Sequence, residues 1–157
     1  MSRILWIIVL FYFSGCRPDR VYDERRTIAQ NSWDYSDVKV FAFDMQDTVN
    51  RYDLMITTRH LYQYEWRNMW IKVETILPDG KKLSDRVNLV LTEPDGEWLG
   101  SCDCVGDYCY TEIPLQSGVT FPLKGKYVFR LIQDMRVNPL PYCAEVGFRV
   151  EKHKSTD

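Results

Sequence analysis

Apolar and polar residues alternate along most of the chain with a period of two, which is the pattern of half-buried β-strands. The clearest case is the last one, where small or charged residues stand at every second position between 146 and 151. The pattern predicts a strand around Arg20 to Ala29 and one more for each alternating segment. The residues on the apolar sides of these segments are Lys39, Phe41, Phe43 and Met45; Tyr52, Leu54, Ile56 and Thr58, continued by Tyr62 and Tyr64; Ile71, Val73 and Thr75; Val87, Leu89 and Leu91; Tyr127, Phe129 and Leu131; and Val146, Phe148 and Val150.

Turn-forming residues separate these segments. Pro78-Asp79-Gly80 and Pro94-Asp95-Gly96 favour tight turns, because proline pre-sets one backbone angle and glycine accepts a positive φ. The run Asn138-Pro139-Leu140-Pro141 predicts an extended loop before the last strand. No stretch combines apolar residues at helical spacing with caps at its ends. The sequence therefore predicts an all-β fold, a single-domain antiparallel β-sandwich that is jelly-roll-like.

The start of the chain has the composition of a targeting segment rather than of a folded element. Met1-Ser2-Arg3 is a short basic start, and Ile4 to Phe13 is an apolar run too short to span a bilayer as a helix. Ser14-Gly15 then places small residues directly before Cys16. This ending resembles the bacterial lipobox, whose cysteine is lipidated on sulfur, although Phe13 stands where that motif usually has leucine. An ordinary secretory signal peptide with a nearby cysteine is the alternative.

These observations divide the chain into four predicted parts. Residues 1–15 are the signal peptide, and residues 16–30 comprise the lipidated Cys16, a spacer and the first strand. Residues 31–152 form the β-sandwich domain, and residues 153–157 are a polar tail. Each buried methylene of an acyl chain such as palmitate contributes about 0.8 kcal/mol, so several chains would act as a lasting membrane anchor.

Charge and motif content exclude several function classes. The formal net charge is −2, with no basic stripe of the kind that nucleic-acid binding requires. His60 and His153 fit no zinc-protease spacing, and no Gly-x-Ser-x-Gly elbow or glycine-rich phosphate loop occurs. A glycosidase-like carboxylate pair has no specificity among 22 acidic residues. We therefore predict a binding protein with no catalytic residues, no metal and no cofactor.

Four cysteines remain once Cys16 is assigned to the lipid, and an even number in an exported domain indicates disulfides. Four cysteines permit three pairings, and one intervening residue makes a bond between Cys102 and Cys104 strained. We expect Cys143 to bond back to the loop from Cys102 to Cys109, which would stabilise the fold by about 3–4 kcal/mol. A four-cysteine zinc site is the alternative, but this spacing fits it poorly.

Five aromatic residues cluster near predicted strand ends and are candidates for a binding surface. Exposed rings bind sugars or protein partners, whereas buried rings are simply core, and we expect a mixture of the two. The five are Tyr62, Tyr64, Trp66, Trp70 and Trp98.

Short sequence runs, taken in order from residue 21 to residue 152, resemble the gliding-motility lipoprotein H (GldH) family. They are Arg59-His60-Leu61-Tyr62-Gln63-Tyr64, Asn68-Met69-Trp70, Pro78-Asp79-Gly80, Glu97-Trp98-Leu99-Gly100, Phe121-Pro122, Gly125-Lys126-Tyr127-Val128-Phe129, Gln133-Asp134-Met135-Arg136, Asn138-Pro139-Leu140 and Val146-Gly147-Phe148-Arg149-Val150-Glu151-Lys152. The resemblance departs at the cysteines, since the family has a glycine-rich loop after Gly100 and an apolar residue at the position of Cys143.

The resemblance implies a cell-envelope lipoprotein required for surface gliding and associated with type IX secretion, with no catalytic activity. We therefore expect an accessory or scaffold subunit whose partners are other envelope gliding and secretion proteins. Arg17-Pro18-Asp19 carries no dense acidic run, which favours the periplasmic face of the outer membrane. A carbohydrate-binding module with a glycan partner is the alternative. Arg59, Arg136 and Arg149 either lock loops by hydrogen bonds or present a fork to a partner's carboxylate.

Overall fold

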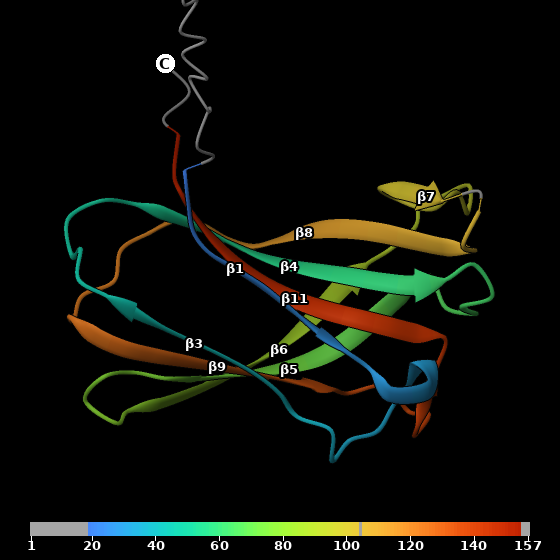
Figure 1. Ribbon diagram of the computed structural model, residues 1–157, viewed down its shortest axis with the longest axis horizontal. Helices are drawn as coiled ribbons and strands as arrows, with labels where there is room; N and C mark the ends of the chain where they lie inside the picture. Colours follow the sequence, from blue (N-terminus) through green and yellow to red (C-terminus); the bar gives the residue numbers. More distant parts are fainter. Residues whose placement is uncertain (1–18, 104, 155–157) are drawn as a thin grey trace, which may run out of the picture.

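The structure is a computed structural model that describes residues 19–103 and 105–154 (Figure 1). The predictions for residues 1–15, Cys16, Cys104 and the last part of the tail, 155–157, lie outside the described residues. The elements are β1 (Arg20–Thr27), a 3-10 turn η1 (Ala29–Asn31), β2 (Ser32–Trp33), β3 (Lys39–Met45), β4 (Tyr52–Leu61), β5 (Asn68–Ile76), β6 (Lys82–Val90), β7 (Ser101–Asp103), β8 (Tyr108–Val119), β9 (Gly125–Gln133), β10 (Leu140–Pro141) and β11 (Cys143–Lys152).

Two antiparallel sheets form a sandwich. One sheet has the order β1-β11-β4-β8-β7, the other has the order β3-β9-β5-β6, and β10 pairs with β2 in a small third sheet. Leaving out the short strands, successive strands alternate between the two sheets, except for β5 and β6, which are paired neighbours in the four-stranded sheet. This strand order is the jelly-roll arrangement of two Greek keys. The predicted fold class is confirmed. Within the described residues no helix is long and apolar enough to cross a membrane.

The core lies between the sheets and includes most of the residues that the alternation placed on the apolar sides, together with others such as Trp33, Met69 and Leu140 that it did not identify. Phe41, Ile56 and Phe148 have no exposed surface, and the rings of Phe129 and Phe148 stack with centroids 4.3 Å apart. Burying a side chain of this size stabilises the fold by about 1.5–3 kcal/mol. The apolar alternation of the sequence therefore sets which face of each strand turns inward.

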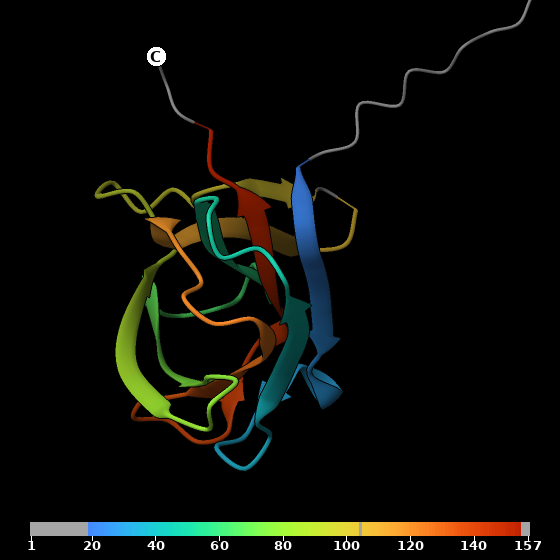
Figure 2. The same ribbon diagram turned by 90° about the vertical axis from the view of Figure 1, so that its left-hand side faces the viewer.

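The two lateral sides of the sandwich differ. On one side β1 and β3 run next to each other, as Figure 2 shows, and the rings of Tyr22 and Phe43 are 5.0 Å apart. Lys39 adds a bond across the same side, where its Nζ donates to the carbonyl oxygen of Thr27 at 2.7 Å. On the other side β6 and β8 are the facing strands, and a groove lies near their ends. We call these the closed side and the open side.

The sequence patterns missed strands on the open side. β8, a strand of 12 residues, and the short β7 were not predicted, nor were the two-residue strands β2 and β10. Conversely, Tyr62 and Tyr64 do not continue β4, which ends at Leu61. The turns at Gly80 and Gly96 are present, with φ of 85° and 95°.

Candidate partner-binding groove

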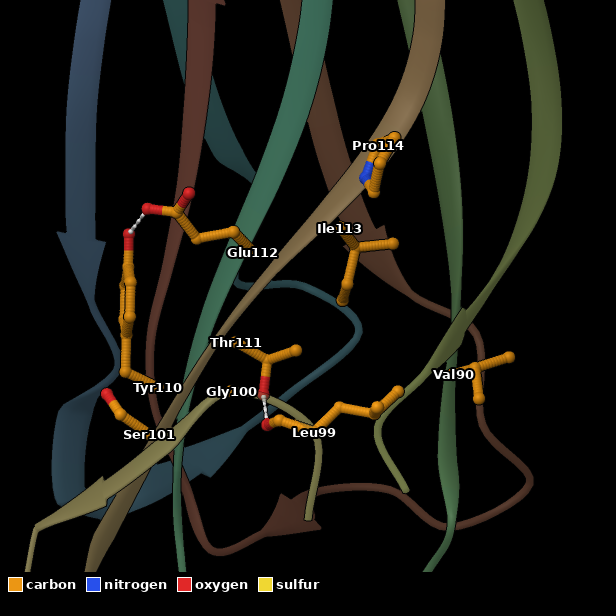
Figure 3. Close-up of a pocket in the computed structure, with 9 residues that line it drawn as sticks. All are labelled: Val90, Leu99, Gly100, Ser101, Tyr110, Thr111, Glu112, Ile113 and Pro114. Carbon is orange, nitrogen blue, oxygen red and sulfur yellow. Dashed lines mark hydrogen bonds between the residues drawn. The ribbon is translucent and has the colours of Figure 1, made fainter. Parts of the chain in front are cut away.

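A groove with a volume of about 640 Å³ opens between β6 and β8 (Figure 3). In Figure 3 the aliphatic side chains of Val90, Leu99 and Ile113 surround a common space. Val90, the last residue of β6, is 48% exposed and so presents its aliphatic side chain to the groove. The lining residues are Val90, Leu99, Gly100, Ser101, Tyr110, Thr111, Glu112, Ile113 and Pro114.

The free edge of β8 forms one wall of the groove. β7 pairs with β8 only from Tyr108 to Tyr110, so that no strand among residues 19–103 and 105–154 pairs with this side of β8 from Thr111 onward. Pro114 fits such a position, because proline lacks an N–H and is confined to sheet edges, strand starts and bulges. The edge therefore offers unpaired backbone groups beside an aliphatic surface.

The segment before β7 is fixed tightly against β8 and forms the end of the groove. Thr111 Oγ1 donates to the carbonyl oxygen of Leu99 at 2.7 Å, and the N–H of Leu99 donates to the carbonyl oxygen of Leu91 at 2.8 Å. Gly100 has φ of 89°, and a Cβ there would lie 2.2 Å from the carbonyl oxygen of Tyr110. Only glycine allows this close approach.

A charged network borders the groove on the outer face of the sheet. The hydroxyl of Tyr110 donates to Glu112 at 2.9 Å, and the guanidinium of Arg149 also pairs with Glu112. The hydrogen bond from Arg149 lowers the pKa of Glu112, and the same bond raises the pKa of Arg149. Arg149 is only 2% exposed, so it acts as a structural lock between strands, which is one of the two expected roles.

The predicted aromatic cluster is mostly packed. Tyr64 is 3% exposed, its hydroxyl donates to the carbonyl oxygen of Asn68 at 3.0 Å, and burial raises its pKa. Trp98 is half-buried, with its ring centroid 4.4 Å from that of His60. Tyr62, at 62% exposure, is the one clearly exposed ring among the five predicted residues. The expected mixture of core and rim is therefore weighted strongly toward core.

Two of the predicted aromatic residues line a second, smaller hollow with Arg136. Its volume is about 310 Å³, and it is lined by Trp66, Trp70, Arg86, Asp134, Met135, Arg136 and Val137. The guanidinium of Arg86 lies over the ring of Trp70, 4.4 Å from its centroid, and so covers part of the indole. The same guanidinium pairs with Asp134. The exposed Arg136 lies at this hollow, where its guanidinium is available to a partner.

Arg59 lies away from both hollows, on the outer face of the five-stranded sheet. Its guanidinium is 4.2 Å from the ring centroid of Tyr108 and 3.3 Å from a carboxylate oxygen of Glu145. These contacts correspond to locking, which is one of the two roles expected for Arg59.

The expected bond from Cys143 to the disulfide loop is wrong. Cys102 and Cys109 face each other in register across β7 and β8 and are bonded to each other. Cys143 is a buried free thiol, and burial raises its pKa. Cys143 and Cys109 both pair with His60, from opposite sides of β4. Two strand spacings, about 9.5 Å, separate them, and a disulfide requires α-carbons within about 7 Å.

His60 is fully buried between these cysteines. Its Nδ1 lies 2.9 Å from the carbonyl oxygen of Leu61, and its Nε2 has no hydrogen-bond partner in the part of the chain that the structure describes. Burial lowers the pKa of His60, because the charged imidazolium would be costly in this position. The residue is therefore neutral core rather than a ligand or an exposed base.

A serine, a histidine and an aspartate, the residue types of a hydrolase triad, lie close together near the end of β11. Their arrangement is not that of a catalytic triad. His153 Nδ1 lies 2.9 Å from Asp53 and 3.4 Å from Ser117 Oγ, and the hydroxyl of Ser117 donates to the same carboxylate. A triad requires serine and aspartate at opposite ring nitrogens. Partial burial tends to raise the pKa of Asp53, but the hydrogen bonds from Ser117, Gly118 and His153 outweigh it and lower that pKa. Asp53 thus links the ends of neighbouring strands. Across residues 19–103 and 105–154 no cluster suits a metal ion.

A comparison with solved structures gives only a distant likeness. A non-crystalline cellulose-specific carbohydrate-binding module is 10% identical with a TM-score of 0.43, over 84% of this chain and 73% of that chain. A likeness at this level carries no argument about function.

The sequence comparisons are specific. The profile of a family described as GldH lipoprotein matches residues 20–150. A gliding motility lipoprotein GldH homolog from Christiangramia forsetii is 34% identical over 158 residues, covering 96% of this chain and 95% of that protein. Gliding motility lipoprotein GldH from Flavobacterium johnsoniae is 27% identical over 158 residues, covering 96% of each. The chain belongs to the GldH family of gliding motility lipoproteins.

Proposed function

We propose that the chain is a lipid-anchored, non-catalytic accessory subunit of the gliding and type IX secretion machinery. Family membership supports the link to gliding motility. Acylation at Cys16 would hold the sandwich in the cell envelope, and the lack of an acidic run in Arg17-Pro18-Asp19 favours the periplasmic face of the outer membrane. The role of the folded domain is then to bind another envelope protein of that machinery.

The groove on the open side carries this proposal. An extended peptide can add to an unpaired strand edge, with main-chain bonds for affinity and side-chain pockets for specificity. The edge of β8 beyond Tyr110 and the aliphatic surface of Val90, Leu99 and Ile113 provide these two elements together. Glu112 and Ser101 add a polar rim. The surface therefore suits an extended, apolar segment of a protein.

The packing of the aromatic residues supports a protein partner over a glycan. Sugar recognition by a sandwich requires several exposed rings along one face or groove, since each sugar unit stacks on a ring. Among the five predicted rings only Tyr62 is clearly exposed, while Tyr64 is core and Trp98 packs on His60. The glycan-binding alternative is therefore kept as an outcome of the test.

Affinity capture from cell envelopes tests the proposal, with the full lipidated chain as bait and captured proteins identified by mass. We expect gliding or secretion subunits to be recovered with the wild type and lost with Val90→Asp, a change inside the groove. Val40→Asp, on the outward side of β3 at a similar 43% exposure, is the matched control and should retain them. Absence of such subunits together with retention on a glycan array would overturn the proposal.

A second experiment tests the anchor alone. Cys16→Ser should release the protein from membranes into the soluble fraction, because it removes the acylated sulfur. A Cys16→Ser protein that stays in the membrane fraction would contradict the anchor, whatever the capture experiment gives.

A further inference from the structure

The folded domain begins almost directly after the proposed lipid anchor. Asp19 is already fixed, because its carbonyl oxygen accepts a hydrogen bond of 2.8 Å from the N–H of Lys152. Only two residues, Arg17 and Pro18, separate Cys16 from Asp19, and the three steps from residue 16 to residue 19 span at most about 11 Å when fully extended. An acylated Cys16 lies at the membrane surface, so Asp19 cannot move far from that surface. This argument rests on the proposed acylation of Cys16.

The strand ends around Asp19 define one end of the sandwich. Arg20 pairs with Glu151 where β1 begins and β11 ends, and the N–H of His153 donates to the carbonyl oxygen of Arg51 just before β4. The turn at residues 46–51, which joins β3 to β4, lies at this end, at the left of Figure 1. We call it the anchored end.

The turn from β3 to β4 presents an apolar side chain to solvent. Asp47 accepts hydrogen bonds from the N–H groups of Val49 and Asn50, at 2.9 and 3.1 Å, and from the hydroxyl of Tyr52 at 2.8 Å. These bonds fix the turn and leave Val49 83% exposed. A rigidly presented valine this close to an acyl anchor is suited to the boundary between headgroups and acyl chains.

Charged groups of both signs surround the start of β1. A hollow of about 230 Å³ there is lined by Asp19, Arg20, Asp53, Glu151, Lys152 and Lys154. The Lys154 side chain is 82% exposed. Zwitterionic and anionic phospholipid headgroups carry phosphates that such basic groups bind, and ethanolamine headgroups carry an ammonium that the carboxylates complement.

The opposite end of the sandwich is far from this surface. β4 runs for ten residues from Tyr52 to Leu61, a length of about 30 Å. At its far end Val105 lies in the turn between β7 and β8 and is 96% exposed. Val49 and Val105 are thus two exposed valines in turns at opposite ends.

A side-on orientation, with the outer face of the five-stranded sheet against lipid, is disfavoured by its charge. That face carries the pairs between Arg59 and Glu145 and between Arg149 and Glu112. Contact with lipid would remove water from the exposed parts of Arg59, Glu145 and Glu112, which is unfavourable for charges. The end-on orientation places mainly Val49 and the mixed-charge strand ends at the surface.

We propose that the short tether seats the anchored end, with Val49 foremost, on the phospholipid headgroups, so that the β6–β8 groove stands away from the membrane. The membrane contact is thus a second binding surface of the domain, separate from the groove. The end of β8 that borders the groove is the end near Tyr108, which lies beside Leu61 at the far end of β4.

Photo-crosslinking tests the orientation, with the full lipidated chain in vesicles of phosphatidylethanolamine and phosphatidylglycerol. The photoreactive residue p-benzoylphenylalanine is placed at Val49 or, as the matched control, at Val105. We expect at least fivefold more lipid adduct from position 49, detected by mass. A third position, Lys154, provides a second probe of the anchored end and should also give at least fivefold more adduct than position 105.

The outcomes separate the orientation from the anchor. Equal yields from positions 49 and 105, or a higher yield from 105, would overturn the end-on orientation. The same spectra report acylation of Cys16, so a protein without acyl mass shows that the proposed anchor is wrong. Melting temperatures equal to that of the wild type check that each variant is folded.

Discussion

The two lateral sides of the sandwich are built from the same alternating pattern but are filled differently. The closed side brings aromatic rings together, with Phe43 in contact with Tyr22, Tyr127 and Phe129 at centroid distances of 5.0, 6.2 and 5.8 Å. The open side carries the shorter side chains of Val90 and Ile113, and a groove remains between them. The difference indicates that the closed side contributes more to stability, and it is consistent with our proposal that the open side binds a partner.

The largest expected effect comes from the closed side. Phe43→Ala should lower the free energy of unfolding by about 3–5 kcal/mol, because it removes a ring from the centre of an aromatic cluster and leaves a cavity. Urea unfolding of the detergent-solubilised protein measures this. Val90→Ala on the open side is the control and should change stability by about 0.5 kcal/mol or less. Similar losses for both variants would mean that the two sides do not differ in the way proposed.

The next effect concerns the disulfide on the open side. Replacing both Cys102 and Cys109 with serine should cost about 2 to 2.5 kcal/mol, the entropy of closing a short loop in the unfolded chain. It should also loosen β7, which is only three residues long, and weaken partner capture. Unfolding with and without reductant provides the measurement. A wild-type protein unaffected by reductant would show that this bond adds nothing to stability.

A smaller effect is the pH dependence from His60. Burial lowers its pKa below the ordinary 6.5, so the unfolded chain takes up a proton as pH falls below that value while the folded chain does not. Stability is therefore complete above pH 6.5 and declines as pH falls, by at most about 1.4 kcal/mol per pH unit. Melting curves from pH 7.5 to 5 measure the decline. His60→Leu should show a shallower decline, and an unchanged slope would exclude His60 as its source.

The sequence was sufficient for β3 on the closed side and for its neighbour β9, because one face of each strand is buried and its alternation is strong. Phe41, Phe43, Phe129 and Phe148 were placed on apolar sides and are core. On the open side β8 also alternates, but its inward set includes Cys109 and Thr111, which do not look apolar. Pro114 also lies within β8, where an edge strand tolerates proline.

The groove could not be predicted for the same reason, since its main wall is β8. To predict which cysteines form the disulfide, one must know the register of β4, β8 and β11. Only that register shows that Cys143 and Cys109 lie on opposite sides of His60. For the aromatic residues we expected a mixture of buried and exposed rings, and the structure has such a mixture. The sequence does not show, however, that Trp98 packs on His60. Long-range register, rather than local pattern, decided each of these points.

The variant with the smallest expected effect on the free energy of unfolding, Val90→Asp, is also the most direct test of binding in the groove. Val90→Asp should change the free energy of unfolding by about 0.5 kcal/mol or less, because Val90 is 48% exposed and the new carboxylate can remain hydrated. An apolar partner segment would have to dehydrate that carboxylate, and it would also meet the nearby Glu112, so capture should fall at least tenfold. Val40→Asp should leave both stability and capture near wild type. If Val90→Asp retains its partners, the open side is not the binding surface, and its groove reflects only the shorter side chains of its edge strands.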